Sequence, residues 1–569
     1  MIASPLVAVC AATFSSMLLA LAGHGLTQGI AVLSLVFGAA TGILTCCITP
    51  RRRDKVTLLE AALFVVFALF ALRGFCWNVF LHDDSVRVLS PNNIGDASLH
   101  LAYINYLSRG VSFWPQNPIF SSLPLHYPLG LDLFNALLTL VGVDVIRGLV
   151  WVGLAGAALT AAALWRWGGG FALAGFLFNG GLAGWHFFER FRWADYNDDV
   201  AWKSIPLAMF VTQRGLLYAL PAGLLLLTSW RAKWFGQKDQ HGVPFAVELL
   251  LFSTLPLFHL HTFIFLSLLL GLWVITEAGK VRKNALRLLV CSFIPATILT
   301  ALVTGLFQAG EGVATKRLVY FKPGWMQGGE NPIFFWLMNF GALPILLALL
   351  IGLIIKRYRQ VEPARVASAF VLPATLFFLS ACFIMLAPWE WDNTKVMIWS
   401  YLVVLPFLWE LLIAKLPLAV RAGCCFILFG SGFVSLFGGL DRTHTGYEIA
   451  RRGELDAVSL AAKETSPEAT FAAYPTYNHP LLLSGHKLVE GYDGHLFSHG
   501  IDYLPTLHDL ELLMNGDASW RELCRKLQVD YLFWGEREEE HYPASRQPWR
   551  EECKVVARGD WGVLYDVGN

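Results

Sequence analysis

Asp96 and His100 stand four residues apart in the stretch NIGDASLHLAYINYLSRG, residues 93–110. On a helix this spacing places both side chains on one face, one turn apart. A carboxylate and an imidazole held in this way can exchange a proton or share a metal ion. Two ligands do not define a metal site, so a divalent metal at Asp96 and His100 is one interpretation and acid–base chemistry is the other.

Asp96 also has a purely structural interpretation. The pattern predicts a helix over 97–108, with Asp96 as its N-cap and Gly110 after its end. The position that would carry the Glu or Gln of a capping box is Leu99. A capping carboxylate can still present one oxygen outward, so the two roles are compatible.

Further polar residues stand at the ends of apolar runs. Asp83 and Asp84 follow one run and compete with Asp96 for the role of a base. Arg214 and Lys395 lie at the ends of two other apolar runs, where a cation is costly unless it binds an anion or reaches water. We expect substrate contacts from these two cations and from a set of nearby residues: His100, Gln213, His259, His261, Asp392, Tyr492, His495 and His499.

Each of these residues also has a simpler explanation. Asp392 can pair with Lys395 three positions later, and His259 and His261 can be satisfied structural histidines in a helical turn. His495 and His499 lie in a glycine-rich loop, GYDGHLFSHG, where loop structure or acceptor contact competes with metal binding. Trp389 and Trp391 suit either a sugar face or the membrane interface.

The composition shows what must position these residues. The chain has 569 residues, 56% of them hydrophobic and only 15% charged, and a mean hydropathy of +0.53. These values indicate a polytopic α-helical membrane protein with about 13 spans. The candidate spans cover residues 4–22, 28–48, 57–80, 146–165, 170–186, 207–230, 245–258, 259–276, 288–308, 333–355, 366–386, 396–414 and 422–440.

The charges divide the chain near residue 440. Residues 441–569 hold 13 Lys and Arg against 22 Asp and Glu, a net charge of −9, whereas residues 1–440 carry +10. We therefore expect a transmembrane domain over 1–440, with a catalytic outer loop at 81–145, and a soluble domain over 441–569. The first apolar stretch lacks a basic region before it, so it is interpreted as a span rather than a signal peptide.

Basic residues lie between alternate spans, as in RRRDK (51–55) and KVRKNALR (280–287). The positive-inside rule places these loops and the N-terminus in the cytoplasm, and the tail outside the inner (plasma) membrane. The outer segments are then 81–145, 187–206, 309–332, 387–395 and 441–569. Acids, histidines and aromatic residues gather on this one face, which indicates a site at the boundary of bilayer and water.

The sequence pattern of residues 441–569, the tail, predicts a small α/β domain. Helices are expected at 447–464, 502–515 and 518–527, and strands at TFAAY, KLVEG, DYLFWG, CKVVARG and WGVLYDV. Cys524 and Cys553 are candidates for a disulfide if the tail is extracytoplasmic. The segment 131–141 in the first loop is too short to span and is expected in the interface.

An ordered set of motifs resembles a bacterial branch of the GT-C superfamily, integral-membrane glycosyltransferases that use polyprenyl-phosphate-linked sugars. The resemblance covers most of the chain, and the motifs are GDASLHLAYINYLSRGVSFWPQNPIFSSLPLHYPLGLDLFNALL (95–138), TQRGLLYALPAGLLLL (212–227), LPLFHLHTF (255–263), PWEWDNTKV (388–396), LLSGHKLVEGYDGHLFSHGIDY (482–503) and VDYLFWGERE (529–538). Two features differ: His486 stands where the family often has Arg, and the helical pair at 4–48 precedes the usual first span.

The resemblance implies an inverting transferase of the cell envelope that moves a hexosyl or pentosyl group from a lipid-linked donor to an acceptor hydroxyl on a glycan, lipid or protein. It implies that Asp96 is the general base. No cofactor is required with certainty, although a divalent metal is compatible. The alternatives are a lipid or solute transporter or flippase, and a non-catalytic assembly protein of envelope polysaccharide export. The sequence contains no GxGxxG, GxxxxGK[ST] or HExxH, so nucleotide-binding and zincin functions lack support, and no nucleic-acid partner is expected.

Overall fold

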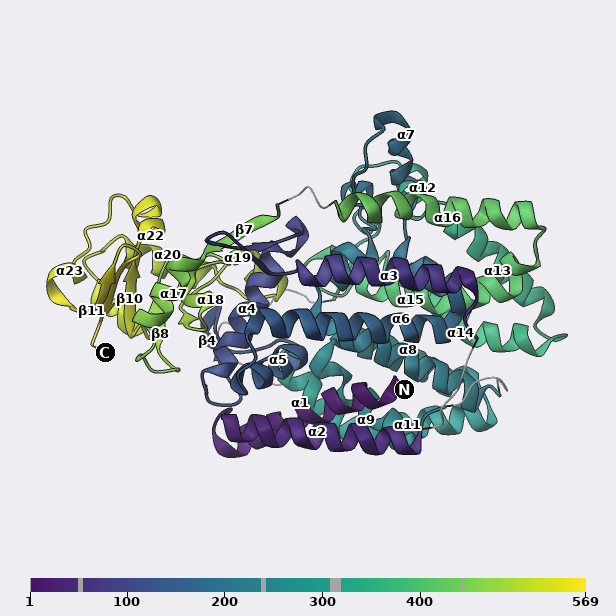
Figure 1. Cartoon of the computed structure of the whole chain (residues 1–569), viewed down its shortest axis with the longest axis horizontal. Helices are drawn as coiled ribbons and strands as arrows, with labels where there is room; N and C mark the ends of the chain where they lie inside the picture. Colours follow the sequence, from purple (N-terminus) through teal and green to yellow (C-terminus); the bar gives the residue numbers. More distant parts are fainter. Residues whose placement is uncertain (1, 50–54, 237–241, 307–318, 442–444, 569) are drawn as a thin grey trace.

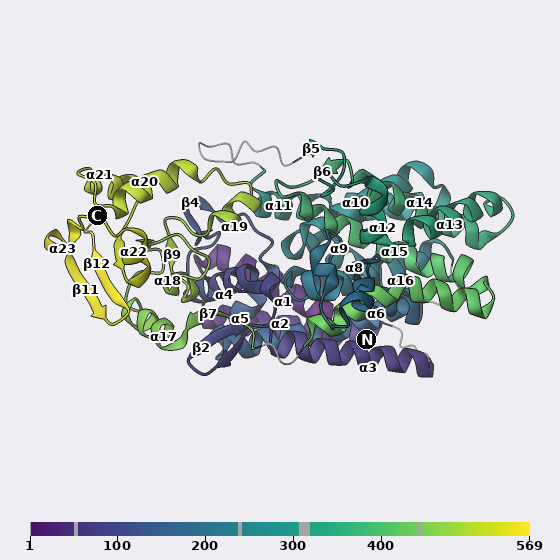
Figure 2. The same ribbon diagram turned by 90° about the horizontal axis from the view of Figure 1, so that it is seen from above.

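A computed structural model describes residues 2–49, 55–236, 242–306, 319–441 and 445–568. Long helices lie side by side in an elongated bundle, and the C-terminal residues form a separate mass at one end (Figures 1 and 2). The helices of the bundle are α1 (Ala3–Gly23), α2 (Gln28–Ile48), α3 (Leu58–Cys76), α6 (Val145–Leu177), α8 (Arg214–Trp234), α9 (Phe245–Phe258), α10 (Leu260–Thr276), α11 (Gly279–Thr304), α12 (Pro332–Phe340), α13 (Leu343–Arg357), α14 (Glu362–Ser380), α15 (Thr394–Phe407) and α16 (Leu418–Gly439).

Within the described residues, eight helical stretches are long and apolar enough to cross a membrane, or nine if the bent pair α12–α13 is one span. This confirms the predicted polytopic helical class, whereas the total of about 13 spans stays a prediction. We call the end of the bundle that carries the C-terminal residues the domain end. The opposite end is called the basic end, because α8 and α13 place Arg231, Lys233, Lys356 and Arg357 in their last turns there.

The chain reverses inside α6. Gly168 and Gly169 have non-helical backbone angles, and the φ of +62° at Gly169 is one that glycine adopts readily. The direction of each half follows from its contacts with α3. In the first half, Gly153 lies against Phe75 and Trp165 against Glu60. In the second half, Gly170 lies against Glu60 and Phe176 against Phe67. The first half is therefore antiparallel to α3 and the second half parallel to it. The predicted turn near Arg166 is present, but the second helix ends at Leu177 and is shorter than the predicted span 170–186.

Two other predicted spans contain breaks. His259 has an extended backbone between α9 and α10, as expected for a helical pair that meets in this motif. The predicted span 333–355 instead bends by 86° between α12 and α13, where Gly341 has a φ of +55°. These breaks occur where glycine or a side chain that caps the next helix replaces the regular hydrogen-bond ladder.

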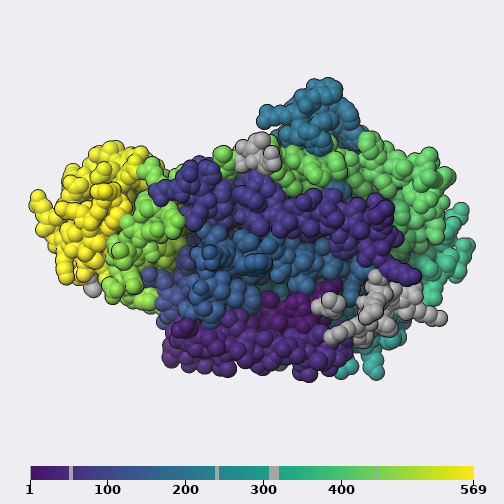
Figure 3. All heavy atoms as spheres, viewed as in Figure 1, coloured from purple at the N-terminus to yellow at the C-terminus, as the bar shows by residue number. Residues whose placement is uncertain are grey.

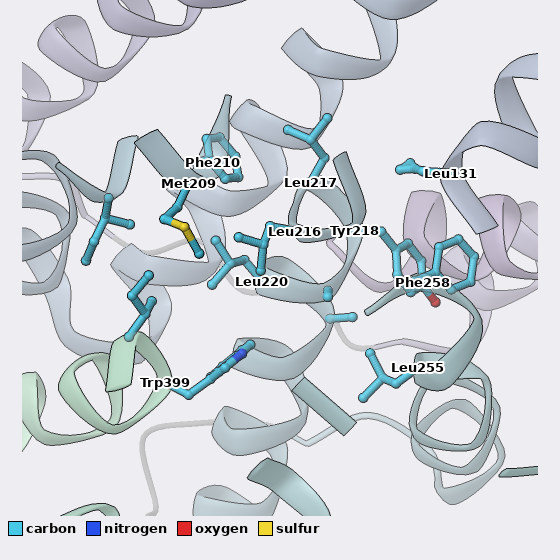
Figure 4. Close-up of a cluster of buried hydrophobic side chains, with 14 of the residues drawn as sticks. Leu131, Met209, Phe210, Leu216, Leu217, Tyr218, Leu220, Leu255, Phe258 and Trp399 are labelled. Atoms are coloured by element: carbon cyan, nitrogen blue, oxygen red, sulfur yellow. The ribbon is translucent and has the colours of Figure 1, made fainter. Parts of the chain in front are cut away.

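The interior of the bundle is built around α8, most of whose side chains are buried. Gly223 leaves room for the ring of Trp399 from α15, which a Cβ would meet at 2.3 Å. The rings of Tyr218 and Phe258 stack with centroids 3.8 Å apart, joining α8 to the end of α9 (Figure 4). These contacts hold the N-terminal end of α8, which carries Gln213 and Arg214, in a fixed place.

The first large loop contains a hairpin of β1 (Phe80–His82) and β2 (Ser85–Val88), then α4 (Ile94–Ser108), the short strands β3 (Gln116–Asn117) and β4 (Phe120–Pro124), and α5 (Gly130–Leu140). Helix α4 begins at Ile94, so Asp96 lies in its first turn and the prediction that Asp96 is the N-cap is wrong. The 3-10 turn over Pro91–Asn93 leads directly into the helix and moves its start forward. Helix α5 is short, as predicted, and packs on α4 and α6.

The C-terminal residues contain a five-stranded sheet in the order β11-β12-β10-β8-β9. All five predicted strands occur: β8 (Thr470–Ala472), β9 (Lys487–Leu488), β10 (Tyr531–Trp534), β11 (Lys554–Gly559) and β12 (Gly562–Asp566). The helices are α17 (Arg452–Ala461), α18 (Pro480–Leu483), α19 (Asp493–Ser498), α20 (Leu504–Met514), α21 (Trp520–Lys526), α22 (Glu536–His541) and α23 (Trp549–Glu552). The predicted helix over 447–464 is wrong for its first part, because Tyr447–Arg451 forms β7 and pairs with β2. Cys524 and Cys553 are both free thiols.

Glu538 holds the loop before α18 to the sheet. Its carboxylate accepts hydrogen bonds from the backbone amides of Tyr474 (2.8 Å) and Gly535 (2.9 Å) and contacts His479 Nε2 at 3.3 Å. Burial raises the pKa of Glu538, but the hydrogen bonds from His479 and the two amides outweigh burial and leave that pKa below its ordinary value. The stabilisation is therefore present at neutral pH and is lost as the pH falls through the lowered pKa.

We expect Glu538→Ala to destabilise the C-terminal sheet by about 3 kcal/mol, because it leaves buried donors without an acceptor. Hydrogen exchange of β8 and β10 in the full chain should become about 100-fold faster. The control is Glu540→Ala, at an exposed position on the same helix, which should change stability by no more than about 0.5 kcal/mol. Equal exchange rates in the two variants would contradict this assignment.

Candidate active site

A cavity of about 1100 Å³ lies at the domain end of the bundle and is formed by α4, the segment 183–203, α12, the Trp389–Trp391 turn and α19. Its volume slightly exceeds the usual range of about 300–1,000 Å³ for ligand pockets. The polar side chains that line it are Asn92, Asp96, His186, Arg190, Tyr196, Asp198, Asp199, Lys203, Gln213, Glu330, Asn339, Tyr492, His495 and Ser498. We call this cavity the chamber.

Asp96 is half-buried and lines the chamber from the first turn of α4. Gln213, the residue before α8, donates from Nε2 to Asp96 Oδ2 at 3.3 Å. Burial raises the pKa of Asp96 above its ordinary value, and the charge of Asp392 acts in the same direction. The charges of His100 and Lys395 and the Gln213 hydrogen bond partly offset this rise. A carboxylate with a raised pKa is better suited to accept a proton than an ordinary aspartate.

His100 does not pair with Asp96 through Nδ1, because that nitrogen contacts Asp132 Oδ2 at 2.9 Å. Asp132 lies on α5 and its other oxygen is 3.5 Å from Arg214 Nε on α8. The exposed fractions of Asp132 and Arg214 are both 2%. One carboxylate thus joins α4, α5 and α8 directly beside the chamber. Asp132 was not predicted because it stands in a largely apolar stretch, DLFNALL, without a charged partner nearby in sequence.

Arg214 is therefore buried beside Asp132 and is absent from the residues that line the chamber. Its three guanidinium nitrogens have no hydrogen-bond partner among the residues that the structure describes. Asp132 compensates the charge but leaves these donors unused, and buried donors are normally satisfied. The guanidinium thus keeps donors that no described side chain uses.

Lys395 and Asp392 form an ion pair at 2.9 Å, with side chains 12% and 14% exposed. Both charges influence Asp96, which places the pair at the same end of the bundle. His259 Nδ1 is held by Thr262, at 2.8 Å from Oγ1, and its ring centroid is 5.7 Å from that of His261. These four residues lie close to one another, but none of them lines the chamber.

The C-terminal residues close the chamber opposite α4. A Cβ on Gly95 would lie only 3.1 Å from His495 Nε2, so this glycine permits the approach of α19. The ring of His495 is 5.3 Å from that of Tyr492, and His499 is 5.4 Å from Tyr127. Burial lowers the pKa of His495 to about 3 and that of His499 to about 4, so both are neutral near pH 7.

Asp83 and Asp84 are not brought to the chamber. They form the turn of the β1–β2 hairpin, where the Asp83 side chain is 90% exposed and contacts His82. The backbone oxygen of Asp84 accepts from the Arg452 amide at 2.7 Å. The family-divergent residue His486 is also remote, because its ring contacts the backbone oxygens of Ala462 and Leu481.

Sequence reasoning also missed Lys203 and Asn92 as chamber residues. Lys203 Nζ is 2.6 Å from Asp198 Oδ1, to which Asn92 Nδ2 also donates at 3.0 Å. Burial raises the pKa of Asp198, but the bonds from Lys203 and Asn92 dominate and lower it. The signal in the sequence is the cluster of acidic residues at 195–199, within the predicted outer segment 187–206.

The two side chains proposed as metal ligands each have one protein partner. Asp96 accepts from Gln213, and His100 Nδ1 contacts Asp132. No group of three or more His, Cys, Asp or Glu side chains placed to hold a metal ion occurs in the part of the chain that the structure describes. The shared-metal interpretation of Asp96 and His100 stays a prediction.

Two solved structures are similar to this chain in overall arrangement. One is the archaeal oligosaccharyltransferase AglB from Archaeoglobus fulgidus in complex with an inhibitory peptide and a dolichol-phosphate, with a TM-score of 0.48, 12% identity, and coverage of 85% of this chain and 70% of that chain. The other is an Archaeoglobus fulgidus oligosaccharyltransferase complex with Zn and sulfate, with a TM-score of 0.42, 12% identity, and coverage of 85% and 69%. No family model and no curated protein matches the sequence.

We expect Asp132→Ala to lower the melting temperature of the chain by several degrees, because it leaves Arg214 as an uncompensated buried cation. Breaking one partner of a buried ion pair costs about 3–5 kcal/mol. The measurement is thermal unfolding of the purified chain in detergent. Asp560→Ala, in the exposed β11–β12 turn, serves as the control and should leave the melting temperature unchanged. Identical shifts for both variants would show that Asp132 does not join these helices.

Proposed function

We propose that the chain is an inverting glycosyltransferase that moves a sugar from a polyprenyl-phosphate donor to an acceptor hydroxyl at the outer membrane face. The observation that carries the proposal is the position of Asp96. It is a half-buried carboxylate with a raised pKa, and it lines a large chamber that contains many polar side chains where membrane helices end. The motif resemblance to GT-C glycosyltransferases supports the same reaction class.

The proposed chemistry needs one base. Asp96 accepts the proton of the acceptor hydroxyl while the oxygen of that hydroxyl forms a bond to the anomeric carbon. The bond from that carbon to the donor phosphate oxygen breaks on the opposite face, so the configuration inverts and polyprenyl phosphate departs. Gln213 holds the Asp96 carboxylate in place through its 3.3 Å hydrogen bond.

The departing phosphate gains negative charge, which fixed cations stabilise. Lys395 is the cation whose charge acts on Asp96, and Arg214, paired with Asp132, carries unused donors. We assign the leaving phosphate to the side of Asp96 on which Lys395 lies. Because Lys395 is held by Asp392 and Arg214 by Asp132, both cations keep their positions before substrate binds.

The acceptor approaches from the side of the C-terminal residues. Tyr492 and His495 line the chamber there, and the neutral histidines offer hydrogen bonds without adding charge. Trp389 and Trp391 line another wall, and their rings suit the apolar face of a sugar. We assign a hydroxyl of a glycan, lipid or protein as the acceptor. In the proposed topology, residues 441–569 form a soluble domain outside the inner membrane, and the N-terminus lies in the cytoplasm.

Asp96→Asn is expected to lower sugar transfer by about 100- to 10,000-fold, because it removes the proton acceptor without a change in shape. The assay supplies a total extract of lipid-linked sugars to membranes that contain the chain, and mass spectrometry follows the glycosylated products. The double variant Asp83→Asn/Asp84→Asn is the matched control and should retain transfer within about twofold, since neither residue lines the chamber. Full transfer by Asp96→Asn, or its loss in the double variant, would overturn the assignment of the base.

The rate of transfer should rise with pH as Asp96 loses its proton, with a midpoint above the ordinary value of 3.8. Gln213→Met removes a hydrogen bond that lowers this pKa, so the midpoint should move to higher pH. The exposed Gln360→Met serves as the control and should leave the profile unchanged. A midpoint that stays in place or moves to lower pH in Gln213→Met would contradict the role of Asp96.

A further inference from the structure

Residues 441–569 contain two cysteines, Cys524 and Cys553. Cys524 lies on α21 and is fully buried, whereas Cys553 is half-buried and follows directly after α23. The apolar cluster between the five-stranded sheet and the helices α20 and α21 contains Cys524, and Cys553 packs against the same cluster. Both sulfurs thus belong to one small core.

Two contacts beside the cysteines hold α21 against α23. The rings of Trp520 and Trp549 have centroids 6.2 Å apart. Arg521 donates from Nε to Glu552 Oε2 at 3.0 Å, and its Nη2 is 2.9 Å from the same oxygen. Arg521 lies one turn before Cys524, and Glu552 immediately precedes the second cysteine. The backbone segments that carry the two cysteines therefore lie side by side.

The electrostatic environment of the thiols also indicates that they are neighbours. Burial raises the pKa of Cys524 to about 12, and the charge of Cys553 acts in the same direction. Burial raises the pKa of Cys553 as well. The guanidinium of Arg521 partly offsets the rise at both thiols. Because such interactions weaken with distance, one guanidinium and both sulfurs must lie close together.

The cysteines lie in the part of the chain that protrudes from the bundle. The C-terminal residues, yellow in Figure 3, form a mass beyond the domain end. In Figure 1, α23 and β11 lie on the side of this mass that faces away from the bundle. In the proposed topology this side is outside the inner membrane, in an oxidising compartment where disulfides form and persist.

We propose that Cys524 and Cys553 form a disulfide that joins α21 to the start of β11. Both thiols are free in the structure, so the bond is a separate covalent step. This inference goes beyond sugar transfer and shares with the proposed function only the side of the membrane on which residues 441–569 lie.

The bond forms by thiol–disulfide exchange with an oxidant that itself carries a disulfide. The thiolate of Cys553 attacks the oxidant, forms a mixed disulfide and releases one thiol of the oxidant. The sulfur of Cys524, after it loses its proton, attacks the Cys553 sulfur and releases the second thiol. The two cysteines lose two protons and two electrons, and the reduced oxidant carries both as its pair of thiols.

The burial of Cys524 indicates when this exchange occurs. In the folded chain its thiol is inaccessible and stays protonated at neutral pH, so it attacks a mixed disulfide slowly. The exchange is therefore fast during folding, before α21 packs on the sheet. The same burial then shields the bond from reductants.

The test measures the thiols of the full chain as it exists in cells. Cells are denatured directly in N-ethylmaleimide, which labels every free thiol and prevents later oxidation, and mass spectrometry follows the peptides of the purified chain. We expect Cys524 and Cys553 to remain unlabelled and their peptides to be linked until a reductant is added. Cys291, which is exposed on α11, serves as the internal control and should be labelled throughout.

Cys524→Ala should leave Cys553 labelled, and Cys553→Ala should leave Cys524 labelled, whereas Cys291→Ala should leave the linked peptides unchanged. The bond closes a loop of about 30 residues, so a reductant should lower the melting temperature of the unsubstituted chain by several degrees. The double variant Cys524→Ala/Cys553→Ala should show no such response.

Maleimide on both cysteines of the unsubstituted chain would overturn the proposal, as would a Cys553 bond between two copies of the chain. The labelling needs no variant and no sugar transfer. A chain that transfers sugar but carries two free thiols would therefore contradict this inference alone, and a linked chain that transfers no sugar would contradict the proposed function alone.

Discussion

The carboxylate of Asp132 is the interaction on which the rest of the site depends. Without a partner, a guanidinium such as that of Arg214 could be buried at the end of a membrane helix only at a large desolvation penalty. Asp132 compensates that charge and at the same time contacts His100, so α4, α5 and α8 meet at one point. The first turn of α4 is thereby fixed, and with it the direction in which Asp96 faces the chamber.

Two distant parts of the chain complete this arrangement. Strand β7 extends the β1–β2 hairpin of the first loop, so the C-terminal residues are anchored to the segment that leads into α4. Helix α19 then reaches Gly95, where the missing side chain lets His495 approach. The site therefore contains residues separated by about four hundred positions in sequence, and its closure depends on the docking of the C-terminal sheet.

Much of the fold could be predicted because it follows from local patterns. Apolar runs define most helices of the bundle, and alternation in the tail defines all five strands of its sheet. The helix start at Ile94 could not be predicted, because a 3-10 turn before it extends the helix and removes Asp96 from the cap. Strand β7 could not be predicted either, since its pairing with β2 is a long-range contact that overrides a helical pattern.

The candidate site also combines residues that could be predicted from the sequence with one that could not. Asp96, Gln213 and His495 were predicted and line one chamber, because polar residues at the ends of apolar runs meet at one face. Asp132 gave no signal in sequence, since a single carboxylate in an apolar stretch resembles an ordinary interfacial residue. Distinguishing Asp96 from Asp83 required the geometry, because both follow the same span and only their side-chain positions separate them.

The central claim is that this chain adds a sugar to a molecule of the cell envelope. The most direct measurement is mass spectrometry of surface glycans from cells that carry the chain, cells that lack it, and deleted cells to which it is returned. The account predicts glycans lighter by the mass of a sugar residue in the cells that lack the chain, and recovery of that mass when it is restored. Identical glycan masses in all three would contradict it.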